Sequence, residues 1–152
     1  MAQTTGAFPS AVGQVEISTD GAAWIDISGS TMSLDAPTQA RMSGETYTLE
    51  GDTAIITAGK REPMELAFSI VYTEEDGEAF DEAQTIFETV GGDDAYARWS
   101  PGGGDAGDWQ YTSGKGKLIS FTYPPVNAET GDPIMAGFTV KVAAVSKAVI
   151  SS

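Results

Sequence analysis

Carboxylates are the only acid–base side chains that this sequence holds in quantity. Its 152 residues include 22 Asp and Glu but no His and no Cys. The absence of these two residue types excludes Ser-His-Asp and Cys-His catalysis, thiol nucleophiles and zinc sites built from His or Cys. A pair of carboxylates can still hydrolyse a glycosidic bond that lies between them. No spacing singles out one pair, so a carboxylate-dependent hydrolase stays an alternative without assigned catalytic residues.

Phosphate-binding and calcium-binding motifs are hinted at but incomplete. Gly114-Lys115 and Gly59-Lys60 have the ending of a phosphate-binding loop, yet neither has the glycine that the motif requires five residues earlier. The aspartates at 93–94, 105 and 108 offer oxygen ligands, but no twelve-residue calcium-binding pattern surrounds them. We therefore expect no metal site, no cofactor and no enzymatic activity.

The formal net charge of −14 limits which partners the protein can hold. A stable grip on a phosphate backbone needs clustered Lys and Arg, and the sequence has only eight of them. Solubility alone also explains such a charge. The N-terminus lacks the basic and apolar regions of a signal peptide, and no stretch approaches a transmembrane length. We expect no membrane association and a protein made and kept in the cytoplasm.

The elements that would position these groups centre on residues 59–101. In Met64–Tyr72, large apolar residues alternate with smaller or polar ones, which predicts a strand with one buried face. Residues 74–90 predict an acidic helix whose apolar stripe, at helical spacing, is formed by Phe80, Ala83, Phe87 and Val90. Thr73 or a following acid can cap this helix, and Gly91-Gly92 ends it. The helix must pack its stripe on a sheet, because the rest of the chain reads as strands and turns.

Short strands separated by turns account for that remainder. Eighteen glycines and seven prolines between short apolar runs favour a mostly β fold. We expect residues 13–18 to pair with 24–27, and 109–112 to pair with 117–123. Further strands are expected at 47–50, 54–57, 95–100 and 134–145. The predicted architecture is a β-sandwich or rolled sheet in a single domain, with one flanking helix.

One long stretch, residues 35–46, has no periodicity and contains Gly and Pro. A structureless loop of that length in a compact domain is usually functional or disordered. We interpret it as an assembly loop, with an ordinary mobile loop as the alternative. The chain then divides into a flexible N-terminal arm, residues 1–12, and one β domain, residues 13–152, that includes this loop.

Several groups of residues, spread from about residue 12 to residue 145, share their arrangement with one family. They are Val12–Ser18 with Asp20–Trp24, Gly59–Pro63, Ile70–Glu74 and Arg98–Pro101. In their order and their local sequences, these segments resemble the tail tube (major tail) protein of long-tailed bacteriophages of the siphophage type. The resemblance covers nearly the whole chain and rests on no catalytic motif.

The resemblance implies a structural virion protein without catalytic residues. Proteins of this kind form hexameric rings that stack into a hollow tube, through which the genome passes during ejection. A long loop reaches the adjoining ring, and here that position falls to Ala36, Pro37, Thr38, Gln39, Ala40, Arg41, Met42, Ser43, Gly44 and Glu45. The implied partners are further copies of the chain and other tail proteins: the tape measure, tail tip and terminator. The implied location is the virion tail, after assembly in the host bacterial cytoplasm.

Acids near the path of the DNA would repel its phosphates and let it slide without specific binding. This repulsion reaches only about 8–10 Å at cellular ionic strength, so only side chains at the lumen surface contribute. Glu16, Glu50 and Glu65 lie on the polar faces of expected strands and are the candidates for lumen-facing acids. The alternative is that all three face outer solvent.

A non-catalytic binding module is the alternative from another class, either carbohydrate-binding or capsid-decorating. It would use an exposed aromatic platform, for which Trp24, Trp99 and Trp109 are the available residues. In a β protein of this size we expect at least two of these side chains to pack in or beside the core instead.

Overall fold

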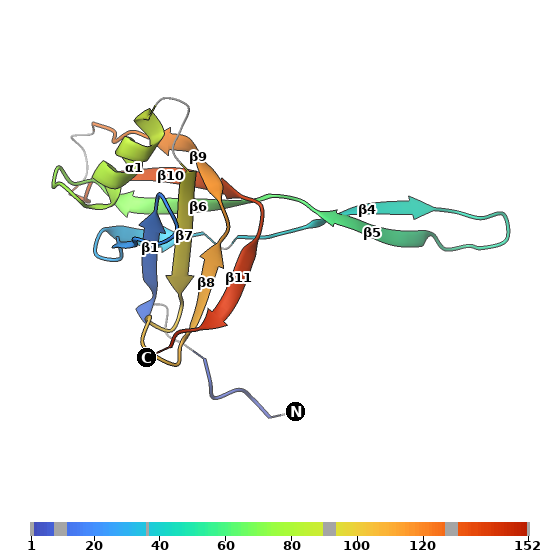
Figure 1. Cartoon of the computed structure of the whole chain (residues 1–152). Helices are drawn as coiled ribbons and strands as arrows, with labels where there is room; N and C mark the ends of the chain where they lie inside the picture. Colours follow the sequence, from blue (N-terminus) through green and yellow to red (C-terminus); the bar gives the residue numbers. More distant parts are fainter. Residues whose placement is uncertain (1, 8–11, 36, 90–93, 127–130, 152) are drawn as a thin grey trace.

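The computed structural model describes residues 2–7, 12–35, 37–89, 94–126 and 131–151. Figure 1 shows a body of strands with a helix at one side, from which a two-stranded hairpin projects far to the right. Among the described residues, nine strands of the body belong to one sheet, and the hairpin forms a second sheet of two strands. The predicted fold class, a mostly β domain with a rolled sheet and a flanking helix, is confirmed.

Strand β7, Asp94–Ser100, divides the large sheet into two halves. The β7 half consists of β7 with β1 (Gln14–Ser18), β2 (Ile25–Asp26), β8 (Trp109–Ser113) and β11 (Val145–Val149). The β6 half consists of β3 (Thr31–Leu34), β6 (Met64–Val71), β9 (Gly116–Thr122) and β10 (Met135–Val142). In Figure 1, β6 and β10 lie across the upright strands of the β7 half, so the sheet folds over onto itself.

The two halves join at the start of β7, where Ala95 pairs with Gly116 of β9. A Cβ atom at Gly116 would lie 2.5 Å from the carbonyl oxygen of Lys141 and 3.3 Å from that of Ala95. Backbone of three strands therefore crowds this position, and only glycine fits it.

One cluster of buried side chains joins both halves and the helix. In β6, Met64, Leu66, Phe68 and Ile70 are buried, while the residues between them are not, as the alternation predicts. Phe68 stacks on Phe138 of β10, with ring centroids 4.5 Å apart. The β7 half contributes Ile17, Ala95 and Ala97 to the same cluster. From β10, Phe138, Val140 and Val142 are buried in it as well.

The helix, α1, spans Ala79–Glu88 and is shorter than the predicted helix at 74–90. It begins late because Gly77 has a φ of +83° and Glu78 is extended. Of the two predicted caps, Thr73 or a following acid, the N-cap position falls to the acid Glu78, whose side chain makes no capping hydrogen bond. The buried side chains are Ala79, Phe80, Ala83 and Ile86. Phe87 of the predicted stripe lies at its rim and stacks on Phe121, with centroids 5.7 Å apart. Val90 and Gly91-Gly92 lie outside the described residues.

The hairpin that leaves the body consists of β4 (Arg41–Thr46) and β5 (Ile55–Arg61), which pair antiparallel. The prediction of a loop over 35–46 is therefore wrong for residues 41–46, which form β4. The predicted strand at 47–50 is also wrong, because these residues lie in the turn region between β4 and β5. Neither face of this hairpin packs on the body, so burial leaves no alternating pattern in its sequence. We call residues 41–61 the hairpin arm.

Strand pairing in the body agrees with the prediction at one hairpin and differs at another. β1 pairs with β2 as expected, with Ile17 opposite Ile25. β8 and β9 were expected to pair, but β8 lies between β7 and β11 while β9 lies between β7 and β10. The strand expected at 134–145 ends at Val142, and the chain turns back as β11. Of the predicted N-terminal arm, residues 2–7 are exposed and outside any strand, and residues 8–11 are not described.

Candidate assembly surface

The hairpin arm is the largest part of the described structure that packs on nothing. Every residue of β4 and β5 is exposed. The exposed residues of the hairpin arm include large apolar ones, with exposed fractions of 54% for Met42, 68% for Tyr47, 106% for Leu49, 53% for Ile55 and 75% for Ile56. An isolated two-stranded hairpin is at best marginally stable in water. The geometry therefore indicates a segment built to dock on another surface.

Hydrogen bonds at the base of the hairpin arm fix where it leaves the body. Gln39 Nε2 donates to the carbonyl oxygens of Glu62, at 3.1 Å, and Ala143, at 2.7 Å. The Glu62 amide donates to the Ala40 carbonyl at 2.8 Å. Gln39 thus ties both strands of the hairpin arm to the residues that follow β10. Within the arm, Arg41 Nη1 donates to the Gly59 carbonyl at 3.1 Å.

The ten residues predicted to form the assembly loop fall in three places. Ala36 lies outside the described residues. Residues 37–40 lead from the body to the hairpin arm, and residues 41–45 form most of β4. Sequence reasoning missed the second strand, β5, which it had placed in the body. A signal for the hairpin exists: β-branched residues 46, 48, 53 and 55–57 flank the Gly51-Asp52 turn.

Glu16, the first candidate lumen acid, is neither free nor fully exposed. Its carboxylate accepts a hydrogen bond from Arg98 Nη2 at 2.9 Å, and its side chain is only 12% exposed. The Arg98 guanidinium also lies over the ring of Trp24, 4.3 Å from its centroid. This carboxylate is compensated within the chain, so it adds little to any repulsive field.

The other two candidates lie far apart in the fold. Glu50 lies between the strands of the hairpin arm, so its placement on a strand face is wrong. Glu65 is exposed on β6 as expected, but it is in register with Lys141, which is in register with Lys117. The structure thus does not bring the three predicted acids together.

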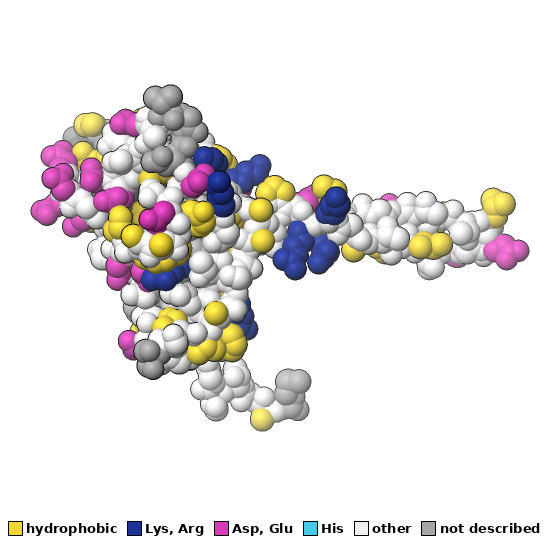
Figure 2. Space-filling view, viewed as in Figure 1, with side chains coloured by type: hydrophobic (Ala, Val, Ile, Leu, Met, Phe, Trp, Pro, Cys, Tyr) yellow, Lys and Arg dark blue, Asp and Glu magenta, His cyan; other side chains and the backbone are white. Residues whose placement is uncertain are grey.

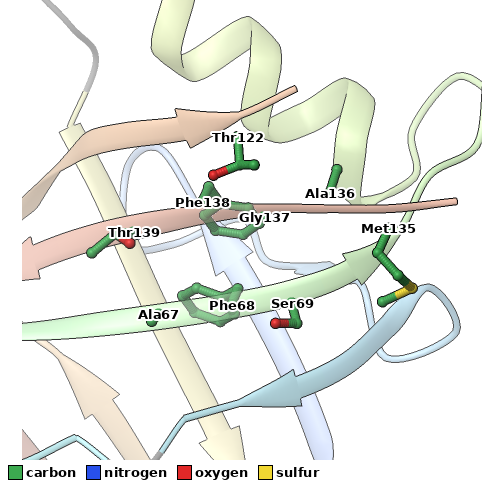
Figure 3. A pocket seen from close by; sticks show the side chains of 9 residues that line it. All are labelled: Ala67, Phe68, Ser69, Thr122, Met135, Ala136, Gly137, Phe138 and Thr139. Carbon is green, nitrogen blue, oxygen red and sulfur yellow. The ribbon is translucent and has the colours of Figure 1, made fainter. Parts of the chain in front are cut away.

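Small side chains line part of the outward face of the β6 half (Figure 3). A shallow depression of about 320 Å³ lies over Ala67, Ser69, Gly137 and Thr139, with the Phe68 and Phe138 rings beneath it. A Cβ at Gly137 would lie 2.8 Å from the Phe68 carbonyl oxygen, so this surface stays flat. No ionisable side chain lines the depression, and it offers neither a catalytic acid nor a base.

The titratable groups with shifted pKa values lie elsewhere. Lys117, and then Lys115, hydrogen-bond to the Asp94 carboxylate and hold its pKa below the usual range. Burial, and then the neighbouring charge of Asp81, raises the pKa of Glu82 on α1. Among the described residues, no three metal-ligating side chains lie close enough together to hold an ion.

The three tryptophans do not form one aromatic platform. Trp99 packs against the core and stacks on Tyr111, with centroids 5.7 Å apart. Trp24 contacts Arg98, which neighbours Trp99 on β7 and so points to the opposite face of the sheet. Trp109 is half exposed and is covered in part by Lys147, whose Nζ lies 4.2 Å from its ring centroid.

Comparison with known proteins gives matches in structure alone. No protein-family model matches the sequence, and no curated protein matches it. A chain of the anti-feeding prophage baseplate matches with a TM-score of 0.76 at 6% identity, with 100% of each chain covered. A chain of the PVC sheath–tube complex, from an extracellular contractile injection system, matches with a TM-score of 0.69 at 12% identity, covering 96% of this chain and 94% of that one. A chain of a gene transfer agent virion matches with a TM-score of 0.65 at 14% identity, covering 94% and 100%.

These matches establish the fold. The chain is built like chains from the tubes, baseplates and tails of injection systems and phage-like particles, so the predicted resemblance is confirmed at the level of the fold. In the described part of the chain, no helix has the length and hydrophobicity needed to cross a bilayer.

Proposed function

We propose that this chain is a tail tube subunit, a structural protein without catalytic activity that assembles into stacked rings. The observation that carries the proposal is the exposed, apolar hairpin arm on a body with the fold of tail and tube assemblies. Six subunits per ring is the symmetry we propose. It is supported by the anti-feeding prophage baseplate, which is six-fold symmetrised, and by the gene transfer agent tail, which has C6 symmetry.

The hairpin arm is the element that joins one ring to the next. Burying its apolar side chains against a neighbour would contribute about 25 cal/mol for each Å² removed from water. Residues 36–45 belong to this contact, as the resemblance implies, and residues 46–61 complete it. The short terminal strands of the sheet, β3 and β11, are the edges through which neighbours in a ring would pair.

The outward face of the β6 half is our candidate for the channel wall. Small neutral side chains line its depression, which therefore offers nothing that grips a phosphate. The cations on this face are Lys141 and Lys117, in register beside Glu65. Glu65 stands on this face and remains the candidate lumen acid with a strand-face position. Glu16 and Glu50 would not line this face, because Glu16 is bound to Arg98 and Glu50 lies on the hairpin arm. DNA would pass without specific binding.

Further partners follow from the same role. Terminator, cap and baseplate assemblies among the structural matches support contacts with other tail proteins at the ends of the tube. The tape measure would occupy the channel before DNA does. We place the protein in the virion tail, after assembly in the host bacterial cytoplasm.

Electron microscopy of the purified protein over a range of concentrations tests this proposal. We expect rings or tubes from the full chain. In a matched variant, residues 43–58 are removed and the two residues Asn-Gly connect Met42 to Gly59 in a tight turn. This variant should stay folded, because none of the removed residues is buried. It should remain monomeric, because it lacks most of the hairpin arm.

Two outcomes would contradict the proposal. A full chain that remains a lone particle at every concentration, even beside a tail-tip initiator complex, would remove the tube function. If the shortened variant forms tubes, the tube function stands, but the hairpin arm does not join one ring to the next.

A further inference from the structure

The base of the hairpin arm carries three cations, and no carboxylate among the described residues pairs with them. Arg41 and Arg61 lie directly opposite each other across β4 and β5, and Lys60 is adjacent to Arg61. Like charges placed directly opposite in a β-ladder are destabilising unless another group compensates them. Within the described part of the chain, none of the three forms an ion pair; the pairs that exist use Arg98, Lys115 and Lys117. The arrangement therefore points to an anionic partner outside the chain.

The opposite end of the body supplies anions without cations. Residues 74–88 contain seven carboxylates, at positions 74, 75, 76, 78, 81, 82 and 88, and no Lys or Arg. Glu74, Glu75 and Asp76 are exposed. The hydrogen bonds that these acids accept come from neutral groups, such as the Tyr72 hydroxyl to Glu74 and the Gly77 amide to Asp81. We call residues 74–82 the acidic end.

Strand β6 holds these two charged regions at opposite ends of the body. It starts just after the hairpin arm and leads into the acidic end. Its eight residues span roughly 26 Å at about 3.3 Å per residue. Figure 2 shows Lys and Arg gathered at the base of the hairpin arm, and Asp and Glu gathered on the side of the body away from it.

We propose that the cations at the base of the hairpin arm, Arg41, Lys60 and Arg61, bind the acidic end of the next copy of this chain. The inference rests on the proposed function, since it names the partner of the hairpin arm. Opposite charges at opposite ends make the contact head-to-tail, and such contacts propagate along a stack. Each side of the hairpin arm has about ten residues, which gives an arm about 33 Å long. This arm then runs along a neighbour whose β6 is roughly 26 Å long. Its apolar residues are covered by that neighbour.

Reciprocal charge reversal tests this contact. One variant carries Arg41→Glu, Lys60→Glu and Arg61→Glu; the other carries Glu74→Lys, Glu75→Lys and Asp76→Lys. Each variant alone should require at least a tenfold higher concentration to assemble than the natural chain. An equal mixture should assemble near the natural concentration, because each variant's altered end then meets an opposite charge. Circular dichroism checks that both are folded, and all six positions are exposed.

Controls separate charge placement from total charge. Ala106→Glu, in the exposed loop between β7 and β8, makes the same change of charge as Lys60→Gln, and only Lys60→Gln should weaken assembly. A second pair of variants with Gln or Asn at the six positions should assemble more weakly and lose the salt dependence of the natural chain. Raising the salt from 0.15 to 1 M shortens the screening length from about 8 Å to about 3 Å.

The outcomes distinguish this contact from the tube itself. If both charge-reversed variants assemble alone as the natural chain does, the contact is wrong and the tube function stands. If both are folded and their mixture still fails, the contact is wrong as well. If the natural chain forms no tubes, sedimentation of the mixed variants still reports on the contact: association only in the mixture supports it, and no association overturns it.

Discussion

Strands β5 and β6 are consecutive in the chain, separated only by Glu62-Pro63, and of nearly equal length, yet they have opposite surroundings. All seven residues of β5 are exposed, whereas β6 buries every second residue. β5 pairs with β4 alone, while β6 pairs with β10 on one side and β3 on the other. β6 therefore draws its stability from the chain's own core, and β5 must draw it from a partner.

The body and the hairpin arm differ in burial and not in the strand propensity of their residues. Ile55 and Ile56 have the same preference for extended backbone as Ile70. Ile70 is fully buried, and Ile56 is 75% exposed. Only the first removes apolar surface from water inside the single chain, which contributes about 1.5–3 kcal/mol for a residue of this size.

Replacing the same residue type in each region should give the largest difference. Ile70→Ala should lower the free energy of unfolding by about 2–5 kcal/mol, because it removes buried methyl groups and leaves a cavity. Ile56→Ala should change it by less than about 0.5 kcal/mol, since the side chain is exposed in the isolated chain. Urea denaturation of both variants measures this. Equal losses in the two would mean that the hairpin arm packs on its own body.

Matched arginines extend the comparison to charged groups. Arg98→Ala should lower the free energy of unfolding by about 1.5–3 kcal/mol, because it leaves the largely buried Glu16 carboxylate without its charged partner and removes the contact with Trp24. Arg41→Ala should have less than about 0.5 kcal/mol of effect on the single chain, since Arg41 is exposed and forms no ion pair among the described residues. Thermal or urea denaturation compares the two, and a larger effect at Arg41 would reverse the assignment of body and hairpin arm.

The smallest effect concerns a turn in the body and its pH dependence. The Ala22 and Ala23 amides, and then the Ser18 hydroxyl, donate to the Asp20 carboxylate and hold its pKa below the usual range of an aspartate. A folded-state pKa below the unfolded one contributes stability above about pH 4, which is lost as pH falls through the folded pKa. The melting temperature should therefore fall between pH 5 and pH 2, and it should fall less in Asp20→Asn.

The matched control for this prediction is in the hairpin arm. Its turn region has one comparable bond, from the Gly51 amide to the Thr48 hydroxyl, with no carboxylate in it. In Glu50→Gln, the melting temperature should therefore fall between pH 5 and pH 2 as much as in the natural chain. If it also falls as much in Asp20→Asn, the Asp20 charge does not stabilise its turn.

Elements with one buried face could be predicted from the sequence. The alternation in β6 and the apolar residues of β10 identify their inward sides correctly, because burial leaves a period of two. The helix is found as well, although its start is misplaced. Gly77 and Glu78 end the extended segment by backbone conformation, which a side-chain pattern does not record.

Pairing partners and the hairpin arm could not be predicted in the same way. Strands β8 and β9 are neighbours in sequence and look like a hairpin, but each pairs with a different part of β7. Of the candidate site, residues 36–45 were expected to form a loop, but residues 41–45 form most of β4, and their partner strand β5 was assigned to the body. The three candidate lumen acids do not lie together in the structure. Their surroundings could not be predicted, because a carboxylate's neighbours across the sheet, such as Arg98 beside Glu16, come from distant parts of the chain.

The residue types and their spacing predict a mostly β chain with one acidic amphipathic helix, exclude His and Cys chemistry, and give a strong negative charge. These are properties of composition and of local periods, which need no knowledge of distant contacts. Three features could be seen only in the folded chain: residues 41–61 leave the body as a hairpin, the sheet folds at β7, and the acidic end lies opposite the cations at the base of the hairpin arm. The reason is that each of these depends on which surfaces meet, and burial between segments far apart in the chain settles that.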